Sequence, residues 1–224
     1  METTFWETMT LTFKLAGLTT LILLCIGIPI GWFLGRSHSK IRPIFEAIVS
    51  MPLVLPPSVL GFYLLLAFSP ESALGRFLID HGFRLAFSFP GLVIASVLFS
   101  LPFMVHPIQS SLAQIPTSLF EASYTLGKSK LQTLLYVIIP LIRPGLFSGM
   151  VLSFAHTIGE FGVVLMIGGN IPNQTRVASI AIYDEVESLN YALAHQYAGT
   201  LFVVTFTILL GVYIFNKSSL KGIG

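Results

Sequence analysis

Charged side chains are scarce in this sequence. Lys, Arg, Asp and Glu make up only 10% of its 224 residues, whereas hydrophobic residues make up 54%. A soluble domain carries about 25% charged residues, and the mean hydropathy of this chain is +0.84. This shortage of charge excludes a soluble globular protein, because the chain could not cover its surface in water. We predict an all-α polytopic membrane protein, since a helix satisfies its own backbone hydrogen bonds in lipid.

Cysteine and clustered histidine are also nearly absent. Cys25 is the single cysteine, so no intrachain disulfide can form. The five histidines are scattered, and no two lie four residues apart, which predicts no metal site. Residues 1–10 hold two glutamates and no basic residue, so we expect no cleavable signal peptide and a first apolar segment that is retained. No cofactor and no nucleic-acid partner are expected.

Long apolar windows make up most of the chain. Three of them carry no formal charge and are about as long as the roughly 20 residues that cross hydrocarbon as a helix. A fourth is slightly shorter, and a fifth is interrupted only by Arg143. Because there is no internal repeat or linker, we predict one transmembrane domain over residues 1–224, with spans at about 12–35, 46–68, 87–109, 133–158 and 197–216.

The positive charges fall in alternate loops, which is the pattern that sets the orientation of membrane helices. Four basic residues and seven acidic residues lie in the loops of one predicted side. Five spans with the N-terminus outside and the C-terminus in the cytoplasm satisfy this split, and they predict a multi-pass protein of the cell membrane. The other eight of the twelve basic residues then lie on the cytoplasmic side: Arg36, Lys40, Arg42, Lys128, Lys130, Arg143, Lys217 and Lys221.

The segment 157–196 has a less regular pattern. Residues 161–169 are apolar, but they number only nine and include three glycines, with Pro172 just beyond them. Residues 177–182 are apolar as well, before a group of acidic residues. We predict two short elements in the outer half of the bilayer, at least one partly re-entrant, because irregular backbone survives at that depth only beside protein or water. A sixth full span is the alternative.

A short polar segment, Glu121–Gly127, stands between apolar runs. Pro116 precedes it, and Ser118 with Glu121 fits the S-x-x-E capping box at the start of a helix. Gly127 is placed to end that helix in a left-handed conformation, and Ser129 can cap the helix that follows. The pattern predicts a helix over about 118–127, which is too short to be stable alone and needs a surface to dock on.

This segment resembles the EAA motif of ABC importer permeases. Gly127 follows Glu121 by six residues and Pro140 follows it by nineteen, as in the motif, while Ser123 stands where the motif has its second alanine. In that family the segment forms the loop on which an ATPase subunit acts. Glu121 can therefore serve as a capping carboxylate, as an ion-pair partner of the ATPase, or as both. The resemblance implies a coupling site formed by Glu121, Ala122, Ser123, Leu126, Gly127 and Pro140.

Four further motifs make the resemblance more specific. Pro52–Pro57, Gly159–Gly162, Gly169–Pro172 and Val177–Asp184 resemble the molybdate (and tungstate) permeases of ABC importers. Sulfate and thiosulfate permeases share two of these motifs and are the alternative. The resemblance implies a type I importer permease with five to six transmembrane helices and a cytoplasmic coupling helix. It also implies a homodimer in lipid, two ATPase subunits and an oxyanion-binding protein.

Physical arguments sort the residues that could line the pathway. Molybdate is a tetrahedral dianion, so hydroxyl, amide and guanidinium groups would hold it and bare carboxylates would repel it. Glu160 is therefore expected to be structural, either accepting hydrogen bonds from glycine-rich backbone or pairing with Arg143 or Arg176. Arg176 could instead attract anions at the outer mouth, and the prolines at 52, 56 and 57 should kink the second span. The candidate pathway residues are Pro56, Thr157, Gly159, Glu160, Gly162, Asn170, Thr175 and Arg176.

Two other classes of protein are alternatives. An ion channel would not need the cytoplasmic helix. A membrane enzyme should place several titratable groups on one helix face, and only His156 and Glu160, four residues apart, meet that condition. We therefore predict a transport subunit and not an enzyme, with ATP hydrolysis carried out by a partner.

Overall fold

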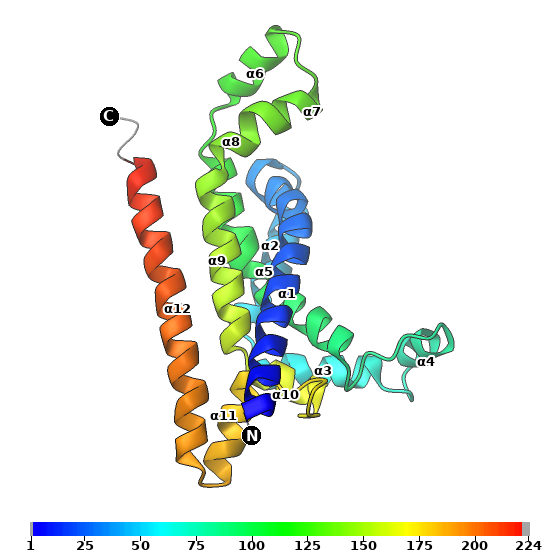
Figure 1. The fold of residues 1–224 in the computed structure, drawn as a ribbon. Coiled ribbons are helices and arrows are strands. Elements are labelled where there is room, and N and C mark those ends of the chain that lie inside the picture. The colour runs from blue at the N-terminus through cyan, green and yellow to red at the C-terminus, as the bar shows by residue number, and fades with distance from the viewer. Residues whose placement is uncertain (1, 221–224) are drawn as a thin grey trace.

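The computed structural model describes residues 2–220, which are almost entirely helical and contain no strand in that range (Figure 1). The all-α prediction is confirmed. Three long helices, α1 (Glu2–Arg36), α5 (Phe89–Ala113) and α9 (Arg143–Gly159), pack against one another. The fourth, α12 (Tyr191–Leu220), runs along the outside of this bundle (Figure 1).

Shorter elements connect the long helices. The short elements are α2 (Arg42–Ser50), η1 (Met51–Leu53), α3 (Pro57–Phe68), α4 (Ala73–Asp80), α6 (Thr117–Thr125), α7 (Lys130–Thr133), η2 (Leu134–Ile138), α8 (Ile139–Leu141), α10 (Gly162–Gly168) and α11 (Ala178–Glu187). Some begin where the sequence supplies a cap: the Ser72 hydroxyl accepts the Gly75 N–H at the start of α4 (2.8 Å).

Within the described residues, three helices are long and apolar enough to cross a membrane, or up to five segments if each bent pair counts as one span. The straight ones belong to α1, α5 and α12. The expected spans at 46–68 and 133–158 are not single straight helices. Residues 42–53 meet α3 at an angle of 107°, and residues 130–141 meet α9 at 69°.

Proline explains both breaks. The second span bends as expected, but the helix is broken there and not merely kinked. Pro56 has an extended backbone (ψ 134°), and a new helix, α3, begins at Pro57. As a result, α3 runs across the direction of the long helices (Figure 1). The second break falls at Ile142, whose ψ is 5°, between Pro140 in α8 and Pro144 in the first turn of α9.

Alpha helices α1 and α5 approach each other closely along a stripe of glycines. Gly27, Gly31 and Gly35 lie four residues apart on α1 and face Met104, Ile108 and Leu112, which have the same spacing on α5. A Cβ added at Gly31 would lie 2.6 Å from Cγ2 of Ile108, and one at Gly35 would lie 2.9 Å from the backbone oxygen of Gln109. The two helices therefore meet nearly backbone to backbone, as membrane helices do where small residues line the contact.

Helix α9 joins the same contact with its own stripe of small residues. A Cβ at Gly149 would meet Met104, and one at Gly145 would meet Ser111 and the Pro107 carbonyl. Further along α9 the stripe becomes polar, because Ser153 and Thr157 continue the four-residue spacing and are both buried. In one half of the three-helix bundle the helices are therefore in close contact at glycines, and in the other half hydroxyl groups are buried between them.

Between α9 and α12 the chain forms two short helices. Helix α10 has seven residues and α11 has ten, so neither is long enough to cross a membrane. Helix α10 packs on α3, and a Cβ at Gly61 would lie 2.8 Å from Cβ of Met166. Both short helices lie at the end of the molecule that holds the start of α1, far from α6 (Figure 1). This segment contains no sixth long helix.

The glycine stripe leads to a matched test within one helix. We expect Gly31→Ala to lower the free energy of unfolding in detergent by about 1 kcal/mol or more, because its methyl group would overlap Ile108. The control is Gly17→Ala, also in α1, where an added Cβ meets no heavy atom within 4 Å in the described structure. Gly17→Ala should be neutral or stabilising. Equal thermal stability of the two variants would contradict the close contact.

Candidate functional site

The polar segment predicted to couple to an ATPase forms α6, at one end of the molecule (Figure 1). The expected capping box is wrong. The helix begins at Thr117, with Pro116 at the N-cap position and no side-chain cap. Pro116 has an extended backbone (ψ 143°), so the helix starts directly after it. Ser118 then lies inside the first turn, where its hydroxyl is not at the N-cap position that the capping box requires.

The end of α6 is as the sequence predicts. Gly127 has a left-handed backbone (φ 77°), and its N–H donates to the Tyr124 carbonyl at 2.9 Å. The Lys128 N–H donates to the Ser123 carbonyl at 3.1 Å. No heavy atom of the described structure lies within 4 Å of a Cβ at Gly127, so glycine is required by the backbone and not by space. Ser129 caps α7 in a capping box with Gln132, which confirms that expectation.

Helix α6 has a docked face and an exposed face. Phe120 and Ser123 are buried, and the Ser123 hydroxyl lies 2.8 Å from that of Thr133 in α7. On the other face Glu121 and Ala122 are exposed, and Leu126 is 80% exposed. A large apolar side chain at the tip of the molecule is suited to a protein partner. Pro140 is not on this face, because it lies in α8 before the second break.

At the opposite end, the structure brings two of the predicted motifs together. Pro56 is the exposed residue before α3, and a Cβ at Gly162 in α10 would lie 2.9 Å from Cβ of Pro57. Gly162 therefore allows α10 to approach the start of α3. Gly159 is exposed, and a Cβ there would meet no heavy atom of the described structure within 4 Å. Gly159 and Pro56 are thus exposed, whereas Gly162 and Pro57 are in tight contact.

Glu160 is buried (4% exposed), and neither carboxylate oxygen has a hydrogen-bond partner within residues 2–220. The Ser96 hydroxyl lies near the carboxylate without meeting hydrogen-bond geometry. The expected pairing with arginine is wrong: Arg143 is at the other end of the 17-residue helix α9, and Arg176 pairs elsewhere. Backbone donors do not bind the carboxylate either. Instead the main-chain carbonyl of Glu160 accepts a hydrogen bond from Ser179 (2.6 Å).

Arg176 is held by acidic residues of α11. Its Nη2 lies 3.1 Å from Oε1 of Glu185 and 3.5 Å from Oδ2 of Asp184. Asn170, which has a left-handed backbone (φ 60°), donates to the same Asp184 oxygen at 2.6 Å. These contacts tie the loop between α10 and α11 to α11. The guanidinium therefore has two carboxylates beside it, and they oppose the attraction of an anion that the sequence suggested.

Thr175 and Thr157 also have structural partners. Thr175 is fully buried; its hydroxyl donates to the Gly168 carbonyl (2.6 Å) and accepts the Ile171 N–H (2.9 Å). Thr157 donates to the Ser153 carbonyl and lies 3.0 Å from the Ser100 hydroxyl. Asn170, Thr175 and Arg176 are therefore brought together in one loop, whereas Thr157 lies in the buried core between α5 and α9.

Sequence reasoning missed the serines of α5. Ser96 and Ser100 are completely buried and lie opposite Glu160 and Thr157. Ser100 also bonds Nδ1 of His156 (2.9 Å), whose ring stacks on Phe103. His156 thus uses Ser100 and not Glu160 as its partner. The four-residue spacing of these serines, matched by that of Ser153 and Thr157, was the available signal.

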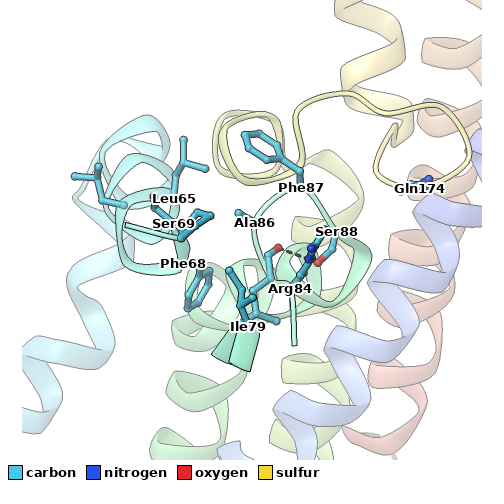
Figure 2. A pocket seen from close by; sticks show the side chains of 12 residues that line it. Leu65, Phe68, Ser69, Ile79, Arg84, Ala86, Phe87, Ser88 and Gln174 are labelled. Atoms are coloured by element: carbon cyan, nitrogen blue, oxygen red, sulfur yellow. Dashed lines mark hydrogen bonds between the residues drawn. The ribbon is translucent and has the colours of Figure 1, made fainter. Parts of the chain in front are cut away.

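A groove of about 960 Å³ lies beside α3, near the start of α5 (Figure 2). It is mainly apolar, and its lining also includes Arg84 and Gln174. Phe87 lines it in a left-handed conformation (φ 56°), held by a hydrogen bond from its N–H to the Ile167 carbonyl (2.8 Å). None of the eight candidate pathway residues lines this groove.

These features define an integral membrane protein with a docking helix at one end and loops that approach each other at the other end. A family model described as binding-protein-dependent transport system inner membrane component matches residues 27–217. The chain therefore belongs to this family of ABC importer permeases. The family assigns it a transport role and leaves ATP hydrolysis to a separate subunit, which confirms that the chain is not an enzyme.

Curated relatives agree over most of the chain. It is 47% identical to the molybdenum transport system permease protein ModB of Azotobacter vinelandii, over 91% of this chain and 90% of that protein. It is 34% identical to ModB of Escherichia coli strain K12, over 82% and 80%. A probable sulfate transport system permease protein, cysT of Chlorella vulgaris, is 35% identical over 89% and 76%.

Solved structures share the fold at low sequence identity. A bacterial ABC transporter that imports the acidic polysaccharide alginate matches with a TM-score of 0.79 at 18% identity, covering 96% of this chain and 79% of that one. An inward-facing methionine ABC transporter, MetNI, matches with a TM-score of 0.67 at 18% identity, covering 96% and 93%. The predicted fold, that of an importer permease, is confirmed.

The unpartnered carboxylate of Glu160 gives a direct test of its role. We expect Glu160→Gln to be at least as stable as the natural chain, because it keeps the shape and replaces a buried carboxyl group that has no partner. Glu160→Ala should lower the free energy of unfolding by roughly 2 kcal/mol through the cavity it leaves. Thermal unfolding in detergent measures both. A loss of stability in Glu160→Gln as large as in Glu160→Ala would show that the carboxyl group is paired.

Proposed function

We propose that this chain is the membrane-spanning permease subunit of an ATP-driven importer that moves molybdate into the cytoplasm. The observation that supports molybdate as the substrate is the 47% identity to a molybdenum permease over 91% of the chain. Relatives named for sulfate transport are between 31% and 35% identical. The molybdenum relative is therefore more similar than those sulfate relatives, which match between 83% and 93% of the chain.

The pathway residues are part of the proposal. Pro56 precedes α3, Gly159 ends α9 and Asn170 follows α10. Helices α3 and α10 lie at the end away from α6 (Figure 1). A dianion passing there would meet backbone and amide groups, which can bind it weakly. The Glu160 side chain is only 4% exposed, so it would not contact the ion directly. The remaining candidates are assigned a structural role: through the contacts described above they hold the segments that form the pathway. These residues are Thr157, Gly162, Thr175 and Arg176.

The arrangement of the ends supports the proposed orientation and the ATPase contact. Helix α6 and the C-terminal end of α12 lie at one end of the molecule, and the start of α1 lies at the other (Figure 1). We place the α6 end in the cytoplasm, because the loops rich in Lys and Arg gather there. The exposed face with Glu121, Ala122 and Leu126 then meets the ATPase. An oxyanion-binding protein would approach the opposite end, near α11.

A second copy of the chain is the proposed partner within the membrane. The most apolar window of α12 is only 11% buried, and its large apolar side chains Phe202, Val203 and Phe206 are exposed. Helix α3 also exposes Phe62, Tyr63 and Leu66. These surfaces are available for lipid and for a second permease subunit. In the homodimer the pathway would lie between the two copies.

Transport in liposomes tests the substrate. The permease is reconstituted with its ATPase, and the oxyanion-binding protein is added outside with radioactive molybdate. We expect ATP-dependent uptake that excess tungstate inhibits, because tungstate matches molybdate in charge and nearly in size. Excess sulfate should leave uptake largely unchanged. Uptake of sulfate, with no uptake of molybdate under the same conditions, would favour the sulfate permease instead.

A further inference from the structure

The α6 helix is attached to the bundle through Phe120. Its ring is 8% exposed, and it lies between two side chains of the last two turns of α1. The Trp32 ring meets it edge-on, with centroids 5.9 Å apart. The Arg36 guanidinium lies over it, 4.5 Å from the ring centroid. Phe120 therefore occupies a socket that α1 provides, although these residues are more than 80 positions apart in the sequence.

Arg36 makes a second contact at the same place. Its Nη1 donates a hydrogen bond to the carbonyl of Ile115 at 2.9 Å. Ile115 is buried in the short linker between the end of α5 and the start of α6. One guanidinium therefore holds both the linker and the ring of the docked helix. Arginine suits this position because its planar, delocalised cation can stack on an aromatic face and donate in its own plane.

The end of α1 that carries this socket cannot shift easily against α5. Gly31 and Gly35 hold the two helices nearly backbone to backbone just before Arg36. A displacement of α6 must therefore either break the contacts of Arg36 and Trp32 with Phe120, or move the ends of α1 and α5 together. Packed contacts of this kind transmit small shifts because they do not deform continuously.

A second attachment of α6 leads to a different helix. The Ser123 hydroxyl bonds that of Thr133 in α7, and the Thr133 hydroxyl also donates to the Ser129 carbonyl (3.0 Å). From there the chain continues through η2 and α8 to the 69° bend before α9. The Ser123 contact thus connects α6 to α9, and the Phe120 contact connects it to α1 and α5. One short helix is therefore attached to different long helices through two separate contacts.

We propose that Arg36 and Trp32 are positioning residues that transmit the movement of α6 to α1 and so couple ATP hydrolysis to transport. This inference rests on the proposed function, since it assumes that an ATPase moves α6. The socket does not bind the substrate or the nucleotide. Its role is to make α1 follow α6, so its loss should separate the two activities and leave both the membrane bundle and the exposed face of α6 in place.

The test is the amount of molybdate transported per ATP hydrolysed in liposomes. We expect Arg36→Gln to lower this ratio by roughly five-fold or more, because it loses the cation over the ring and weakens the bond to the linker. ATP hydrolysis and copurification of the ATPase should stay within about two-fold of the natural complex. Arg36→Lys keeps a cation with one donor and should restore part of the ratio. Lys40→Gln, which removes an exposed cation from the loop just after α1, is the control.

A double-mutant cycle identifies the socket as the cause. Phe120→Leu keeps an apolar side chain and removes the ring, so it should lower the ratio without unfolding α6. If Arg36 acts through Phe120, the double variant should be no worse than the more affected single variant. Independent, multiplying losses in the double variant would overturn the inference. So would an unchanged ratio in Arg36→Gln.

Failure of the inference is distinguishable from failure of the proposed function. If the natural complex transports sulfate and no molybdate, the substrate assignment fails, and the role of the socket is then tested by the amount of sulfate transported per ATP hydrolysed. If the natural complex transports molybdate and Arg36→Gln does so at the same ratio, only the role of the socket fails. A parallel loss of assembly, hydrolysis and transport in Arg36→Gln and Arg36→Lys would also overturn it, because that pattern indicates a purely structural contact.

Discussion

The close contact between α1 and α5 is the constraint on which the rest of the molecule depends. Lipid tails are as apolar as leucine, so burial of apolar surface does not hold membrane helices together, and packing at short range must do so. Gly27, Gly31 and Gly35 supply that packing. This packing fixes the position of the C-terminal end of α1 along α5, and so it positions the Phe120 socket. Helix α9 completes the bundle through its own small residues and carries Glu160 into the core.

The same bundle contains a polar half that opposes its stability. Glu160 and Ser96 are buried there, and neither has a hydrogen-bond partner in the described residues. A buried polar group without a partner costs on the order of 1–3 kcal/mol, so the glycine contact at the other end must offset this. The division places the well-packed half beside α6 and the polar half beside the candidate pathway. We therefore expect the polar half, beside the candidate pathway, to be the less stable one.

The sequence was sufficient for features that depend on local chemistry. Apolar windows predicted the helical fold, Gly127 predicted a left-handed helix end, and Ser129 predicted a helix cap, because each depends on a few adjacent residues. It failed where partners come from distant elements. Arg176 pairs with acidic residues of α11, and Glu160 lies opposite Ser96. The ion pair between Arg176 and Glu160 that their charges suggested therefore does not form. Proline predicted a kink at 56 but not its 107° angle, nor the packing of α3 on α10 beyond it.

The central claim is that α6 faces the cytoplasm, where an ATPase can reach it. Single cysteines at positions 76 and 128 on a Cys25→Ser background test it most directly, because Arg76 and Lys128 are both exposed and Cys25 is the only natural thiol. Intact cells are treated with a membrane-impermeant thiol reagent, and inverted vesicles are treated in parallel. We expect labelling of position 76 only in cells and of position 128 only in inverted vesicles. Labelling of position 128 in intact cells would contradict it.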